Sequence, residues 1–97
     1  MAALPPDVER WICVHFAAAD VDAARELLAG AVDRAGLAPE TRLLRCAALG
    51  SRGDLAQLRY LVGLLRVDFR DVIMFGEYDV VDGKLIRVRN LNEPLSP

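Results

Sequence analysis

The chain has 97 residues, of which 54% are hydrophobic, and its formal net charge at neutral pH is −2. A chain of this length is expected to form one domain with a modest core, because small domains bury only about two thirds of the surface of the unfolded chain. The slight excess of acids disfavours a protein devoted to nucleic acids, whose binding domains are usually basic. The hydrophobic fraction exceeds the average of about 45–50%, and self-association commonly buries such a surplus.

The longest uncharged apolar run, 11–19, is far below the about 20 residues that a membrane-spanning helix needs. The N-terminal residues lack the basic region of a signal peptide. Cys13 and Cys46 fit no zinc-binding spacing, and both are expected to be buried reduced thiols, with a disulfide between them left open. The sequence therefore predicts a cytoplasmic protein that is not in a membrane.

The first half of the chain predicts two helices from apolar residues that recur every three to four positions. The first helix, about 5–18, opens with two prolines, and Asp7 is the expected cap of its free amide groups. The second, about 20–35, is the most clearly amphipathic, with a cap at Asp20 and a stop at Gly36. Its apolar stripe consists of Val21, Ala24, Leu27, Leu28, Ala31, Val32 and Ala35.

Three shorter helices are predicted next, at about 39–49, 54–66 and 68–76, with caps at Asp54 and Asp68. Pro39-Glu40 opens the third helix, which is expected to turn Leu43, Leu44, Ala47 and Ala48 inward and Arg42 and Arg45 outward. Gly63 within the fourth helix is expected to permit a close helix–helix contact, because glycine is otherwise costly there.

The last third of the chain changes to the alternation of β-strands around Asp82-Gly83, which predicts a hairpin over about 77–90. We predict a loop of three residues, because it places the apolar side chains on one face of the hairpin. These are Tyr78, Val80, Ile86 and Val88. The same loop places Glu77 and Asp79 as partners of Arg87 and Arg89. Residues 91–97 are predicted to be an irregular tail.

These elements together predict a mainly α fold, a compact bundle of four to five short helices with a C-terminal two-stranded β-hairpin. An isolated hairpin is only marginally stable in water, so its apolar face is expected to dock on the helices or on another chain.

His15 is the only histidine, and a small enzyme that uses it with nearby acids is one hypothesis. It shares a stripe with Trp11 and Phe16, which favours a packed structural histidine. A zinc site at His15 would need both cysteines and an acid. No cofactor and no catalytic site are predicted.

Asp68, Asp71, Glu77 and Asp79 form an acidic cluster in the sequence, and paired carboxylates of this kind bind divalent cations or serve acid–base chemistry. The alternative gives each a structural role: Asp68 and Asp71 as the cap and first-turn acid of a helix, Glu77 and Asp79 as ion-pair partners in the hairpin. We favour the structural roles.

Residues 41–70 carry six arginines and two acids, which is a local excess of positive charge. The third and fourth helices with their Gly-rich break resemble a helix-turn-helix, so nucleic-acid binding is a second hypothesis. Its candidate contacts are Arg42, Arg45, Gln57 and Arg59.

The favoured function is a small protein-interaction or regulatory domain that forms a homodimer or binds a protein partner. Aromatic residues and methionine are enriched at protein interfaces, and several large ones are hard to place in so small a core. The candidate interface residues are Trp11, Tyr60, Met74, Phe75 and Tyr78.

Overall fold

The computed structural model describes residues 4–34 and 41–95, except for the side chains of 32–34. This part of the chain folds into helices followed by a C-terminal antiparallel hairpin, which confirms the predicted fold class. The elements are α1 (Pro6–His15), a 3₁₀ turn (Ala18–Asp20), α2 (Val21–Arg34), α3 (Thr41–Ser51), α4 (Leu55–Leu65), α5 (Phe69–Glu77), β1 (Tyr78–Val81) and β2 (Lys84–Arg87).

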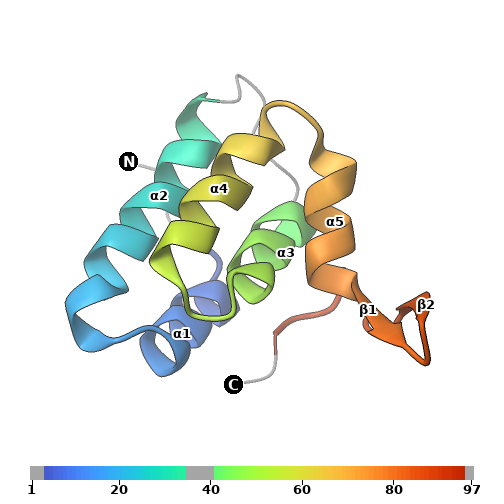
Figure 1. The fold of residues 1–97 in the computed structure, drawn as a ribbon. Coiled ribbons are helices and arrows are strands. Elements are labelled where there is room, and N and C mark those ends of the chain that lie inside the picture. Colours follow the sequence, from blue (N-terminus) through green and yellow to red (C-terminus); the bar gives the residue numbers. More distant parts are fainter. Residues whose placement is uncertain (1–3, 35–40, 96–97) are drawn as a thin grey trace.

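The α3 helix is the centre of the bundle, with α1, α4 and α5 packed around it. The α2 helix lies beside α4 on one side of the molecule, α1 crosses below them, and α5 lies on the other side of α4 (Figure 1). The hairpin projects from the end of α5 away from the bundle (Figure 1). The C-terminal segment then returns beneath the helices.

The core contains the apolar stripes that the helical spacing predicts. Fully or almost fully buried residues come from every helix and also from the C-terminal segment: Leu4, Val8, Trp11, Ile12, Phe16, Ala24, Leu28, Ala31, Leu44, Cys46, Ala47, Ala48, Leu58, Leu61, Val72, Leu91 and Leu95. The predicted stop at Gly36 and start at Pro39 lie outside the described residues, as do Ala35 and the side chain of Val32.

The predicted caps at Asp54 and Asp68 are present, since each carboxylate accepts a hydrogen bond from a backbone amide of the helix it precedes. The prediction for Asp7 was wrong. Pro5 occupies the N-cap position of α1, and the Asp7 carboxylate instead binds Arg45 and the amide of Leu95. The α1 helix also ends three residues before the predicted boundary, because Phe16 is extended and turns into the core.

The outward orientation predicted for Arg42 and Arg45 was wrong as well. The Arg45 side chain is only 11% exposed and pairs with Asp7, and the Arg42 side chain pairs with Glu77. Both point into the molecule because α3 is surrounded by other elements, so even its polar face meets protein.

The hairpin has a two-residue turn instead of the predicted three-residue loop. Asp82 and Gly83 both have positive φ angles, 51° and 77°, as a type I′ turn requires. The register pairs Val80 with Leu85 and Asp79 with Ile86, so apolar and charged residues share both faces. The predicted sorting assumes one buried face, whereas β2 is exposed along its whole length.

Glycines at two helix positions also differ from expectation. A Cβ on Gly63 would meet nothing within 4 Å among residues 4–34 and 41–95, so no close helix contact within these ranges explains this residue. The close contact lies at Gly76, where a Cβ would be 2.6 Å from the Cα of Cys46. Gly76 thus lets α5 lie directly on the backbone of α3.

Candidate interaction surface

Four of the five predicted interface residues lie together on α4, α5 and the hairpin. The Tyr60 side chain is 55% exposed, Met74 and Phe75 are each 40% exposed, and Tyr78 is partly buried. The hairpin adds Val80, 71% exposed, which the sequence placed on the apolar face of the hairpin, and Leu85, 53% exposed, which the sequence did not single out. We call this set, Tyr60, Met74, Phe75, Tyr78, Val80 and Leu85, the α5–hairpin surface.

Several residues of the α5–hairpin surface lie next to one another. The rings of Tyr60 and Phe75 meet edge to face, with centroids 6.2 Å apart and an interplanar angle of 83°. A shallow hollow of about 280 Å³ lies where α5 meets the hairpin, and Met74, Phe75 and Leu85 line it. An exposed apolar area that runs across three elements is typical of a protein-binding surface.

Trp11, the fifth predicted interface residue, lies in the core. It is 4% exposed, its ring stacks on His15 at a centroid distance of 4.3 Å, and Phe16 meets its edge. Both Trp11 and His15 line a second hollow, which shares Arg52 and Phe75 with the first. The predicted interface residues that lie at or near the surface therefore all come from the second half of the chain.

Glu77 determines how the hairpin leaves the bundle. Its side chain is fully buried at the junction of α5 and β1, and it accepts hydrogen bonds from Nε and Nη2 of Arg42, both at 2.8 Å. It also accepts from Nε of Arg87 at 2.9 Å, from the amide of Leu91 at 3.1 Å and, at 4.0 Å, from the thiol of Cys46. The hydrogen bonds from Arg42 lower the pKa of Glu77, since they stabilise the ionised carboxylate.

Asp79, two residues after Glu77, also attaches the hairpin to the bundle. Its carboxylate pairs with Arg52, from the end of α3, and with Arg89, each at 3.1 Å. The predicted partnership of Glu77 and Asp79 with Arg87 and Arg89 is therefore confirmed. The ion pairs of Glu77 and Asp79 orient the hairpin, whereas the apolar residues of the hairpin face solvent.

The two cysteines are free and lie in different environments. Cys13 is exposed on α1, so the prediction that both thiols are buried was wrong for this residue. Cys46 is buried on α3 beside Glu77, and burial, followed by the charge of Glu77, raises the pKa of the Cys46 thiol to about 12.

The acidic residues do not gather into a cation site. Asp68 caps α5 and Asp71 lies in the first turn of that helix, as predicted. Glu77 and Asp79 both have arginine partners. Within residues 4–34 and 41–95, no three His, Cys, Asp or Glu side chains are placed to hold a metal ion.

Two of the four candidate nucleic-acid contacts, Arg42 and Arg45, form ion pairs with carboxylates inside the molecule, which disfavours the nucleic-acid hypothesis. Arg59 is exposed on α4 and Gln57 is partly exposed in its first turn. His15 is exposed, and in the described part of the chain its ring partner is Trp11 rather than an acid.

Among the helices of the described ranges, none is both long enough and apolar enough to cross a membrane. Comparison with models of known protein families, with curated proteins and with solved structures finds no match. The function of the chain is therefore inferred from its own residues.

Sequence reasoning placed Val80 on the apolar face of the hairpin and named Glu77 as an ion-pair partner, but it missed Leu85 and the complete burial of the Glu77 side chain. A glutamate at the boundary of a helix and a strand gives no sign of burial in the sequence. Its burial follows only once its partners, which include two arginines and one backbone amide, are known. Leu85 carries a signal that is visible in the sequence: a two-residue Asp-Gly turn pairs Val81 with Lys84 and, one position further from the turn, Val80 with Leu85.

Proposed function

We propose that this chain is a small cytoplasmic protein-interaction domain that forms a homodimer through the α5–hairpin surface and has no catalytic activity of its own. The observation that carries the proposal is the exposure of the hairpin. Its apolar residues face solvent on both sides of the strands, and they continue into exposed aromatic residues of α4 and α5.

The physical argument starts from the marginal stability of a two-stranded hairpin. Such a hairpin needs further strands or a packed face to be stable, and in the described chain it has no third strand and no helix covering it. A second copy supplies the missing cover, because an isologous contact places the same apolar surface on itself.

Packing of side chains fits this hairpin better than pairing of strand edges. An antiparallel pair of β2 strands centred between Leu85 and Ile86 would place Lys84 opposite Arg87 of the second copy. Like charges at facing positions destabilise a sheet, and cations on an edge strand are a known protection against such pairing. The proposed contact therefore uses Phe75, Val80 and Leu85 on the surface rather than the edge of β2.

Two features support the remaining parts of the proposal. The free thiols of Cys13 and Cys46 suit a reducing compartment such as the cytoplasm. The fixed attachment of the hairpin, through the fully buried Glu77, presents the surface in one orientation, as a specific interface needs.

The test is the solution mass by size-exclusion chromatography with light scattering, at several protein concentrations. We expect a species of twice the 10.6 kDa of one chain. The double variant Val80→Glu/Leu85→Glu should be a folded monomer, as judged by circular dichroism, because two carboxylates cannot be buried in an apolar contact. The matched control is Val67→Glu, at an 84% exposed valine in the α4–α5 turn, which should remain a dimer. A monomeric parent protein, or a dimer that survives Val80→Glu/Leu85→Glu, would refute the proposal.

A further inference from the structure

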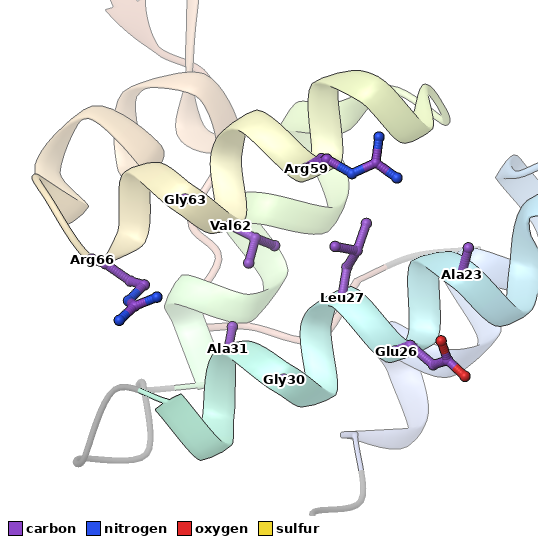
Figure 2. A pocket seen from close by; sticks show the side chains of 9 residues that line it. All are labelled: Ala23, Glu26, Leu27, Gly30, Ala31, Arg59, Val62, Gly63 and Arg66. Carbon is purple, nitrogen blue, oxygen red and sulfur yellow. The ribbon is translucent and has the colours of Figure 1, made fainter.

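A second surface lies on the other side of α4 from α5 (Figure 1). The α2 and α4 helices form the two walls of a groove of about 400 Å³. Leu27 and Val62 point into the space between the helices, and Arg59 and Arg66 extend from the α4 wall (Figure 2). Arg59 lies toward the start of α2 and Arg66 toward its end, so the two helices run in the same direction.

The first observation about this groove is a pair of glycines. Gly30 on α2 and Gly63 on α4 both line it, and each lies within a helix, where glycine costs about 1 kcal/mol relative to alanine. At neither position would a Cβ meet an atom of the described residues within 4 Å, so packing inside that part of the chain gives no reason for them. What they do provide is helix backbone without a side chain on both walls, exposed at Gly63 and partly exposed at Gly30, which another backbone is free to approach closely.

The second observation is independent and concerns charge. Seven arginines in the described part of the chain form ion pairs with carboxylates: Arg25, Arg42, Arg45, Arg52, Arg70, Arg87 and Arg89. Within the described residues, Arg10, Arg59 and Arg66 form none, and two of these three, Arg59 and Arg66, line the same groove. The groove thus has an apolar floor and two cations without carboxylate partners along one wall.

We propose that the α2–α4 groove binds an amphipathic α-helix of a partner protein, with small and apolar residues on the face that enters the groove and carboxylates directed at Arg59 and Arg66. A helix fits because both walls are parallel helices and the groove runs along them. Amphipathic helices insert their apolar stripe into grooves of this kind.

The spacing of the arginines sets the spacing of the acids. Arg59 and Arg66 are seven residues apart, which is about two helical turns or about 10 Å along α4. A partner helix that lies along the groove matches them with two acids that are also seven residues apart. Glu26 on the α2 wall favours a basic residue on the opposite edge of the same helix, which fixes the direction in which the helix lies.

The test uses synthetic helical peptides of about 18 residues with leucine and alanine along one face. One peptide carries two glutamates seven residues apart beside the apolar face, and its control carries two lysines at the same positions. Binding to the full chain is measured by fluorescence anisotropy of the labelled peptides. We expect the glutamate peptide to bind at least about tenfold more tightly than the lysine peptide, by a margin that shrinks as salt is added.

Charge exchange makes the test specific to the groove. Arg59→Glu/Arg66→Glu should reverse the preference, so that the lysine peptide becomes the tighter ligand. Arg10→Glu, at another exposed arginine on α1, is the matched control and should leave the preference unchanged. Gly63→Leu should abolish binding of both peptides by filling the groove, and it should fold because the added side chain meets open space.

Equal binding of the two peptides, or a preference that Arg59→Glu/Arg66→Glu does not alter, would overturn the proposal. Loss of self-association in Arg59→Glu/Arg66→Glu, measured by light scattering, would also overturn it, because the occupant would then be a second copy of this chain. The homodimer proposed above is tested separately, since its variants lie on the hairpin.

Discussion

Arg45, in the middle of α3, reaches the carboxylate of Asp7 in the first turn of α1, with Nε 2.8 Å from Oδ2. The same guanidinium donates to the carbonyl oxygens of Leu91 and Asn92, and Asp7 accepts from the amide of Leu95. One ion pair thus joins the beginning of the chain, its central helix and its C-terminal segment. That segment has no regular structure, as predicted, yet Leu91 and Leu95 are buried.

Replacement of Asp7 by alanine should destabilise the protein by about 2–4 kcal/mol. The Arg45 side chain is 11% exposed, so it would remain a nearly buried cation without its carboxylate, and the amide of Leu95 would lose its acceptor. The measurement is the free energy of unfolding from urea titration, followed by circular dichroism. The matched control is Asp22→Ala, whose side chain is 91% exposed and pairs with Arg25, and which should cost no more than about 0.5 kcal/mol. Equal losses for the two variants would contradict the role given to Asp7.

Acid should destabilise the fold through Asp7 and Glu77. Burial acts to raise the pKa of Asp7, but hydrogen bonds from Arg45 and Leu95 outweigh it, so the pKa lies below its ordinary value of 3.8. The pKa of Glu77 is likewise lowered from 4.5, chiefly by Arg42. Both carboxylates therefore bind protons more readily in the unfolded chain, and stability falls as the pH drops below about 4.5.

The check on this pH dependence is the urea midpoint measured between neutral pH and pH 3. It should be nearly constant at first and then decline steeply in the acid range. The variant Glu77→Gln should be less stable at neutral pH and should show a shallower decline, because one of the two titrating groups is gone. A parallel decline in the variant and the parent would assign the acid sensitivity to other carboxylates.

The helices were predictable because each carries its own apolar stripe, and a stripe depends only on local spacing. The directions of the Arg42, Arg45 and Glu77 side chains were not predictable, because α3 becomes central only when α1, α4 and α5 pack around it. The direction of a charged side chain at such a position depends on a partner from a distant part of the chain. Asp7 and Arg45, for example, are 38 residues apart.

The hairpin shows a different limit. The Asp82-Gly83 pair is itself the signal for a two-residue turn, since both residues accept positive φ. A different loop that places all apolar residues on one face is favoured only if that face is buried within the chain. Here neither face of the hairpin is buried. The turn chemistry therefore decides the register, and the exposed apolar residues become evidence about a partner instead of about the fold.

Two glycines should respond oppositely to alanine. Gly76→Ala should destabilise the protein markedly, because the new Cβ would lie 2.6 Å from the Cα of Cys46 and would force α5 away from α3. Gly63→Ala should instead stabilise it by up to about 1 kcal/mol, since the space is open and alanine is the better helix former. Thermal unfolding of the two variants tests both signs. A stable Gly76→Ala would mean that the helices pack less closely than described.

The two thiols should differ sharply in reactivity. Cys13 is exposed and should react with a disulfide reagent such as Ellman's reagent within seconds to minutes at pH 8, whereas Cys46 should not react in the folded protein. Its reaction needs a thiolate, and burial raises the pKa of Cys46 to about 12 while the surrounding helices exclude the reagent.

The expected result is one thiol modified per chain in buffer and two in concentrated urea, read from the absorbance of the released thiolate. Cys13→Ser is the control and should leave only the slow reaction. Since Cys46 lies against Gly76, the slow rate measures how often α3 and α5 separate, and Gly76→Ala should increase it. Rapid modification of both thiols in the folded parent would be incompatible with a buried Cys46 and with the close α3–α5 contact beneath the hairpin.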